Sequence, residues 1–156
     1  MSTRKPIIGV IGASQPSPAG LRMAEEVGCE IAMRGAVLVC GGLGGVMEAA
    51  ARGAQRAGGM TIGILPGFSF EDANPFITIP IVTGMSHARN VLVVRSSQAV
   101  IALEGGYGTL SEVAIALTLG IPVVGLGSWE VSREIIMVET PEVAVEKAIH
   151  AINRTR

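Results

Sequence analysis

The stretch "QAVIALEGGYGTLSEVAIAL", residues 98–117, decides the fold of this chain. It opens with a short apolar run typical of a buried strand, passes through a turn with three glycines, and continues with apolar residues at helical spacing. Glycines at this density beside a strand indicate that the backbone approaches something closely. A strand that runs through a tight turn into a helix is also the repeating unit of a parallel sheet covered by helices, so the stretch predicts an α/β fold.

The same pattern of apolar run, glycine and helical segment recurs along the chain. It predicts one Rossmann-like, doubly wound domain over 1–156, with about six mostly parallel strands and helices on both faces of the sheet. Strands are expected at 6–11, 36–40, 60–65, 77–82, 98–103 and 121–126. Helices are expected at 18–34, 45–57 and 86–96, from the turn at 104–109 onward, and at 141–153, with a loop at 66–76.

Composition excludes several classes of protein. A formal net charge of −1 argues against a protein that covers nucleic-acid phosphates, which needs a basic face, although it leaves room for local basic sites. The uncharged run at 113–129 is interrupted by three glycines and a proline, so it is not expected to span a membrane. The N-terminal apolar segment is too short for a signal peptide, and a cytoplasmic protein is expected. Cys29 and Cys40 lack CxxC spacing and are predicted to be buried, reduced thiols.

Three predicted strands end in short glycine-bearing turns that run into helices, at 12–14, 40–45 and 104–109. Because the carboxyl ends of parallel strands share one edge of the sheet, we expect these turns to lie together. Free backbone N–H groups and the positive end of a helix dipole suit each turn to binding an anion. None matches a complete dinucleotide or Walker motif, so tight strand-to-helix packing is the alternative for any single turn.

Thr109 and Glu112 allow two interpretations. Their spacing fits a capping box, in which Thr109 caps the helix and Glu112 reaches back to its backbone N–H. Alternatively, Glu112 lies at the mouth of the glycine turn and takes part in acid–base chemistry or holds a ligand hydroxyl. The spacing alone does not choose between the two.

Arg89 is predicted in the first turn of the helix after the fourth strand, with Ser86 as the helix cap. The helix dipole disfavours a cation there, so an anionic ligand or a carboxylate partner is one explanation and simple solvent exposure is the other. The neighbouring His87 is either a polar loop residue or a catalytic one. His150 is isolated and Asp72 is the single aspartate, so no metal site is expected.

Three motifs together resemble the LOG (LONELY GUY) or lysine-decarboxylase-like superfamily, with similarity over roughly residues 6–125. They are "GGLGGVMEAAARGA" at 41–54, "SHARN" at 86–90 and "EGGYGTLSE" at 104–112. The hallmark PGGxGTxxE of that family is matched in register by Gly105, Gly106, Gly108, Thr109 and Glu112. A second element, HxRK, is matched by His87 and Arg89.

The resemblance implies a homodimer or higher homo-oligomer with shared active sites. It also implies a phosphoribohydrolase that releases the free base and ribose 5-phosphate from nucleoside 5′-monophosphates, such as AMP, without a required cofactor. Arg89 and Glu112 would be the catalytic pair, with Glu112 stabilising an oxocarbenium-like transition state. The residues expected to hold the phosphorylated ligand are Gly12, Ala13, Ser14, Gly41, Gly42, Met85, Asn90, Gly105, Gly106, Gly108 and Thr109.

Two positions depart from the hallmarks. Glu104 replaces a proline and Asn90 replaces a lysine, and both changes are expected to disfavour a phosphate, by roughly a few tenths to a few kcal/mol. With "ANPFITIPIVTG" at 73–84, they resemble the branch that includes the molybdenum-cofactor carrier proteins, which bind a phosphorylated pterin. The alternative function is therefore a non-catalytic carrier or sensor of a phosphorylated heterocycle such as molybdenum cofactor.

Lysine decarboxylation is not expected. A pyridoxal-phosphate decarboxylase needs a lysine for its Schiff base. The candidates, Lys5 and Lys147, precede the first strand and fall in the last helix, so neither lies in a strand-end turn. A third interpretation is an assembly-only role, in which the glycine turn no longer holds a ligand.

Overall fold

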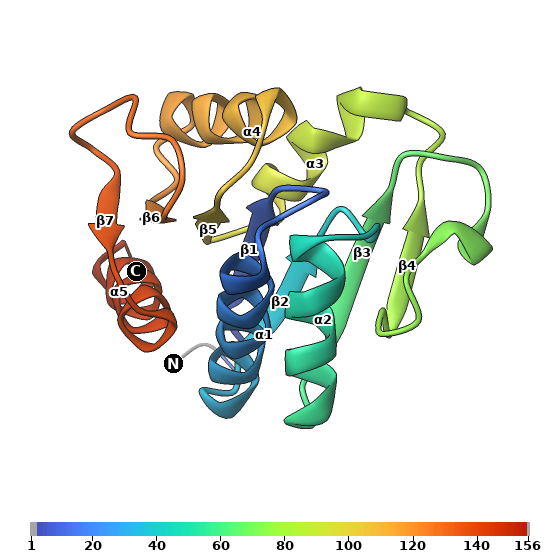
Figure 1. Cartoon of the computed structure of the whole chain (residues 1–156), viewed down its shortest axis with the longest axis horizontal. Coiled ribbons are helices and arrows are strands. Elements are labelled where there is room, and N and C mark those ends of the chain that lie inside the picture. Colours follow the sequence, from blue (N-terminus) through green and yellow to red (C-terminus); the bar gives the residue numbers. More distant parts are fainter. Residues whose placement is uncertain (1–2, 156) are drawn as a thin grey trace.

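The computed structural model describes residues 3–155, which form a seven-stranded sheet in the order β4-β3-β2-β1-β5-β6-β7 (Figure 1). Every neighbouring pair of strands is parallel. Strand order reverses at β1, whose two neighbours are β2 and β5, as in a doubly wound fold. The strands are β1 (Ile7–Gly12), β2 (Val37–Cys40), β3 (Thr61–Leu65), β4 (Ile79–Val82), β5 (Ala99–Leu103), β6 (Val123–Leu126) and β7 (Ile136–Val138).

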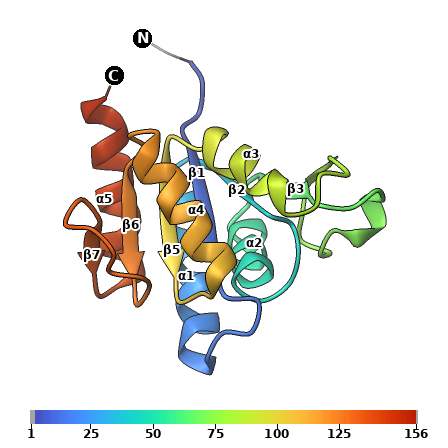
Figure 2. The same cartoon turned by 90° about the horizontal axis from the view of Figure 1, so that it is seen from above.

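Helices cover both faces of the sheet (Figure 2). One face carries α1 (Pro18–Met33), α2 (Val46–Arg56) and α5 (Pro141–Arg154), and the other carries α3 (Asn90–Arg95) and α4 (Tyr107–Thr118). Each face has its own hydrophobic core, because successive side chains of a strand point to opposite sides. In β1, for example, Val10 belongs to the core under α1, α2 and α5, while Ile11 belongs to the core under α3 and α4.

The helices α1 and α2 pack with their backbones in close contact. A Cβ atom added at Gly28 would lie 1.8 Å from the carbonyl oxygen of Ala50, and one added at Gly53 would lie 1.9 Å from that of Glu25. Each helix therefore contributes a glycine at the point where the other helix crosses it. This contact fixes how the glycine turns that precede the two helices sit beside each other.

The predicted α/β class and doubly wound topology are confirmed, with four differences in detail. The sheet has seven strands rather than about six, because the short apolar run at 135–138 forms β7, an edge strand of three residues that was not predicted. It is parallel throughout rather than mostly so. The loop at 66–76 contains a 3₁₀ turn, Phe70–Asp72. The expected helix at 86–96 is a 3₁₀ turn, Ser86–Arg89, followed by α3.

Two smaller predictions are wrong. Ser86 caps no helix: it is the first residue of the 3₁₀ turn, its φ is 53°, and neither that turn nor α3 has a side-chain cap. Cys40 is buried as expected, but Cys29 is only partly buried on α1. No helix within residues 3–155 combines the length and apolar character needed to cross a bilayer.

Candidate functional site

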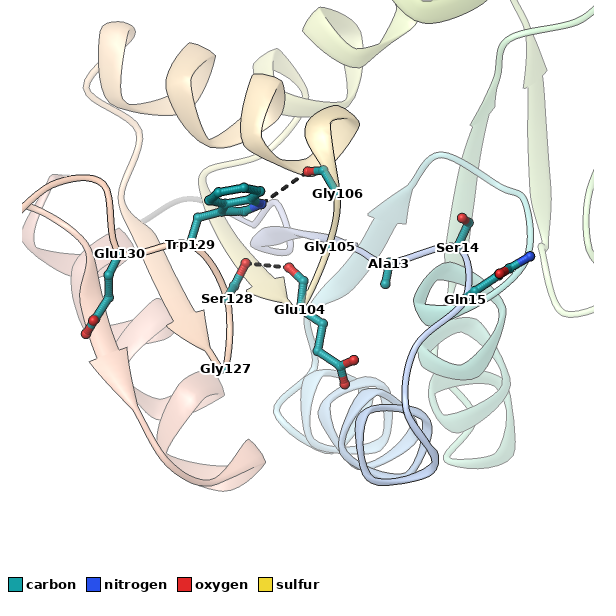
Figure 3. Close-up of a pocket in the computed structure, with 10 residues that line it drawn as sticks. All are labelled: Ala13, Ser14, Gln15, Glu104, Gly105, Gly106, Gly127, Ser128, Trp129 and Glu130. Atoms are coloured by element: carbon teal, nitrogen blue, oxygen red, sulfur yellow. Dashed lines mark hydrogen bonds between the residues drawn. The ribbon is translucent and has the colours of Figure 1, made fainter.

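The turns that follow β1, β2 and β5 meet at the carboxyl edge of the sheet, where two neighbouring hollows open. We call the larger one, of about 730 Å³, the outer cleft; it is drawn in Figure 3. It is lined by Ala13, Ser14, Gln15, Glu104, Gly105, Gly106, Gly127, Ser128, Trp129 and Glu130. The second, which we call the inner pocket, measures about 320 Å³ and shares Ser14 and Gly106 with the cleft.

The N-terminus of α4 borders both hollows. Its N-cap is Gly106, and no side chain caps it among the described residues. The first N–H groups of a helix have no intrahelical acceptor, so those of Tyr107, Gly108 and Thr109 are available to a ligand. Thr109 is the third residue of α4 rather than its cap, so the capping-box interpretation is not realised. The reason is that a glycine cap lets the helix begin three residues earlier than the capping pattern suggests.

The starts of α1 and α2 differ from that of α4, although α2 also begins behind a glycine, Gly45, without a side-chain cap. Ser17 caps α1 by accepting a hydrogen bond from the N–H of Gly20 at 3.0 Å. The N–H of Val46, the first residue of α2, donates to the carbonyl oxygen of Ala13 at 3.0 Å. The three turns predicted as anion sites are therefore not equivalent, and the geometry favours the one at α4.

Arg89 is buried in the inner pocket, with 8% of its surface exposed, which rules out the solvent-exposed alternative. Its Nε donates to the carbonyl oxygen of Ile64 at 2.9 Å, and one Nη donates to that of Gly41 at 3.4 Å. The other Nη donates to Oδ1 of Asn90. A Cβ on Gly41 would lie 2.7 Å from the guanidinium, so glycine leaves room for the arginine. Burial lowers the pKa of Arg89, and the charge of Glu112 opposes that shift.

Glu112 faces the same pocket from α4 and is also 8% exposed. Burial raises its pKa to about 7, although the nearby charge of Arg89 acts in the opposite direction. At neutral pH the protonated and ionised forms of Glu112 are therefore present in similar amounts, which suits the group to acid–base chemistry. Cys40 lies close to this pair, and burial raises the pKa of its thiol to about 11, so it stays protonated.

Glu104, the residue that departs from the family hallmark, directs its carboxylate toward α1 (Figure 3). Its oxygens accept hydrogen bonds from the N–H of Ser17 at 3.0 Å and the hydroxyl of Ser17 at 2.8 Å. Its backbone has a φ of 50°, and its carbonyl oxygen accepts a hydrogen bond from Ser128 at 2.6 Å. The added charge thus serves the N-terminal end of α1, a role that the sequence did not indicate.

The structure brings most of the predicted residues together. The inner pocket is lined by Gly12, Ser14, Gly41, His87, Arg89, Asn90, Gly106, Gly108, Thr109 and Glu112. Ala13, Glu104 and Gly105 line the outer cleft. Gly42 and Met85 line neither of these hollows: Gly42 has a φ of 78° and packs beneath Leu65, and the side chain of Met85 is exposed.

Sequence reasoning missed the side of the cleft that the segment after β6 provides. Gly127, Ser128 and Trp129 lie there, and the indole N–H of Trp129 donates to the carbonyl oxygen of Gly106 at 3.1 Å (Figure 3). A signal was present, because "GLGSW" at 125–129 places glycine directly after a predicted strand, as the three recognised turns do.

The chain is similar to two groups of known proteins, the molybdenum cofactor carrier proteins and the cytokinin riboside 5′-monophosphate phosphoribohydrolases. The molybdenum cofactor binding protein of Rippkaea orientalis has a similar structure, with a TM-score of 0.91 and 41% identity over 97% of this chain and 99% of that one. The molybdenum cofactor carrier protein of Chlamydomonas reinhardtii gives 0.88 and 36%, over 96% and 99%. The cytokinin riboside 5′-monophosphate phosphoribohydrolase of Mycobacterium tuberculosis is 38% identical over 137 residues, 78% of this chain and 71% of that protein. The predicted resemblance is confirmed: the chain belongs to the SLOG cluster4 family, whose model matches residues 5–152.

Proposed function

We propose that this chain binds a phosphorylated heterocyclic ligand, with the phosphate on the first-turn N–H groups of α4. The observation that carries the proposal is the glycine N-cap of α4, which leaves these groups uncapped beside two hollows. Uncapped amides and the positive end of the helix dipole together favour a dianion. Gly105, with a φ of 114°, lets the preceding loop turn sharply enough to expose them.

A carrier role is the first candidate for what the bound ligand does. The outer cleft, at about 730 Å³, is within the range of ligand sites and can admit a ring system as large as a pterin. The molybdenum cofactor proteins match nearly the whole of this chain and are themselves matched nearly end to end. Molybdenum cofactor, a phosphorylated pterin, is therefore proposed as cargo, held by its phosphate and released intact.

Nucleotide hydrolysis is the second candidate, favoured by Arg89 and Glu112 in one buried pocket. Ionised Glu112 would stabilise positive charge at the sugar C1′ as the bond to the base nitrogen breaks, and would take a proton from the water that adds to C1′. The departing base carries away the bonding electron pair and receives the proton that Glu112 took from water, which restores the carboxylate. Because the pKa of Glu112 is about 7, turnover by this route should rise with pH through that value.

An engineered N-cap tests the phosphate site directly. In Gly106→Asp, the new carboxylate caps α4 and occupies the amides that the phosphate would use. A Cβ at Gly106 meets nothing within 4 Å and its φ is −101°, so the change should be sterically tolerated. We expect Gly106→Asp to lose binding of AMP and inorganic phosphate, measured by calorimetry, while the melting temperature rises. Gly106→Ala adds a methyl group without an acceptor and should still bind; equal loss in both variants would contradict the proposal.

The two candidate roles are separated by product analysis. Purified protein is incubated with AMP and with N6-substituted AMP, and free base is measured by chromatography. Release that is lost in Glu112→Ala supports hydrolysis. Binding without release at high protein concentration supports the carrier.

The homo-oligomer implied by the family stays a prediction. Exposed apolar side chains on and near the edge strand β4 offer a surface for it: Phe68, Phe70, Ile79, Ile81 and Met85. Light scattering on the purified chain measures the mass. A monomeric mass across the micromolar range would contradict this prediction and leave the phosphate site unaffected.

A further inference from the structure

The single tryptophan and the single tyrosine of the sequence lie together beside the N-terminus of α4. Tyr107 is the first residue of that helix, and Trp129 follows β6. Their rings are stacked, with centroids 6.5 Å apart and planes inclined by 26°. In a chain with only 3% aromatic residues, this pairing at the edge of the candidate site calls for an explanation.

Core packing does not explain the pair. Tyr107 is 85% exposed, and neither ring belongs to the two hydrophobic cores. Instead, Trp129 lines the outer cleft and Tyr107 lines the inner pocket, so the stacked pair stands where the two hollows adjoin. Tyr107 is exposed and Trp129 partly so, and the rest of the outer cleft is lined by small and polar residues, so the indole is its one large flat surface. A flat apolar ring at the edge of a polar hollow is typical of a ligand site.

The indole is held in a fixed position relative to the phosphate site. Its N–H donates to the carbonyl oxygen of Gly106, which is the N-cap of α4. Its neighbour Ser128 donates to the carbonyl oxygen of Glu104 at 2.6 Å, so two hydrogen bonds join the segment after β6 to the glycine turn (Figure 3). The indole ring therefore lies beside the uncapped amides of α4 without covering them. One ligand can then place its ring on the indole and its phosphate on the amides.

We propose that Trp129 is the ring-binding residue of the outer cleft. A flat heterocycle stacks on its indole while the phosphate of the same molecule lies at α4, and Tyr107 supports the indole by stacking with it. The inference rests on the proposed phosphate site and names the ligand class more closely: aromatic heterocycles that carry a phosphate, as opposed to sugar phosphates. Stacking accepts any π face, so purine and pterin rings would both be bound.

The test compares a phosphate ligand with and without a ring. Trp129 is the chain's single tryptophan, so its fluorescence reports directly on a ring bound there. We expect AMP to quench this fluorescence and to bind about tenfold or more tightly than ribose 5-phosphate, which should not quench it. Calorimetry supplies the affinities, and chromatography confirms that AMP stays intact during the measurement.

Variants separate stacking from folding. In Trp129→Ala, the affinities for AMP and ribose 5-phosphate should lie within about threefold of each other, because stacking on the indole supplies the extra affinity for AMP. The affinity for ribose 5-phosphate should be unchanged. Trp129→Phe keeps a π face but loses the bond to Gly106, and should keep part of the preference. Tyr107→Ala should weaken the binding of AMP but not that of ribose 5-phosphate. The control is Phe68→Ala, which removes an equally exposed ring, at 87%, that lines neither hollow and should change neither affinity.

The outcomes are distinct. Equal affinities for AMP and ribose 5-phosphate in the unmodified chain, or an AMP preference that survives Trp129→Ala in a folded protein, would overturn the assignment of Trp129 while leaving the phosphate site standing. Failure of both ligands to bind would overturn the phosphate site itself and the ring site with it.

Discussion

Glu104 and Ser17 are 87 positions apart in the sequence, yet the Glu104 carboxylate accepts hydrogen bonds from both the backbone N–H and the hydroxyl of Ser17. Ser17 in turn caps α1. The glycine turn after β5 is thus joined to the start of the first helix. This contact places an anionic side chain at the positive end of α1, where a dipole favours it.

Substitutions at Glu104 should separate its charge from its backbone shape. Proline, the residue of the family hallmark, has φ near −65° and cannot adopt the value of 50° seen here. Glycine adopts it freely. We expect Glu104→Pro to be less stable than Glu104→Gly by about 2 kcal/mol or more, as measured by urea unfolding. Equal stabilities would show that the turn can rearrange to the hallmark conformation.

Glu112 should make stability fall as pH rises. Its pKa in the folded chain is about 7, above the ordinary value of 4.5, so folding favours the protonated form. That contribution is complete below about pH 4.5 and is lost as pH rises through about 7, a change of about 3 kcal/mol. The unmodified chain should lose this contribution between pH 5 and pH 8, whereas Glu112→Gln has no carboxyl group to titrate. We therefore expect the difference in free energy of unfolding, variant minus unmodified chain, to become more positive over that range.

The control for this experiment is Glu146→Gln, on the exposed face of α5. It removes one carboxylate without touching the inner pocket. A pH-dependent difference of the same size in both variants would show that burial of Glu112 is not its source.

Arg89 should lower the pKa of Glu112 and stabilise the inner pocket through its hydrogen bonds. Arg89→Met removes the donors to Ile64 and Gly41 and the charge that opposes the effect of burial on Glu112. We expect a loss of stability of about 2–4 kcal/mol at neutral pH. The carboxyl resonance of Glu112, identified with Glu112→Gln, should titrate above 7. Arg89→Lys keeps a charge and should shift the titration less; an unchanged midpoint in Arg89→Met would contradict the coupling.

The two thiols should differ strongly in reactivity. Cys40 is buried, its pKa is raised to about 11, and its sulfur accepts a hydrogen bond from the N–H of Gly42 at 3.4 Å. Cys29 is partly exposed and lines a separate hollow on α1 and α2. With an aromatic disulfide reagent at pH 8, we expect one fast equivalent from the native protein and a second only on unfolding. Cys29→Ser should abolish the fast phase; a fast phase that persists would show that Cys40 is accessible.

The strands could be predicted because buried parallel strands are continuous apolar runs, and five of the six expected ranges contain the observed strand completely. The exception, β1, extends one residue further, to Gly12. By contrast, β7 was missed although "IIMV" at 135–138 is an apolar run, because a run of four residues without a glycine turn after it does not match the pattern of the other strands.

At the site, spacing correctly brought Arg89 and Glu112 to one edge of the sheet but could not reveal their burial, which is what raises the pKa of Glu112. The capping box failed for a local reason, since α4 begins at Tyr107 behind a glycine cap. Contacts between distant segments, such as Ser17 with Glu104 and Gly106 with Trp129, leave no periodic trace in the sequence.

The reversal of strand order at β1 has a thermodynamic consequence. Residues 13–14 follow β1, and residues 41–45 follow β2, which lies on the side of β1 toward β4. Residues 104–109 and 127–130 follow β5 and β6, which lie on the opposite side of β1. A ligand at this edge would therefore touch segments from both halves of the chain and bind the folded state alone. At one hundred times its dissociation constant, such a ligand adds about 2.7 kcal/mol to the free energy of unfolding. Binding should then slow amide hydrogen exchange in β1 and β5, the neighbouring strands that connect the two halves of the sheet.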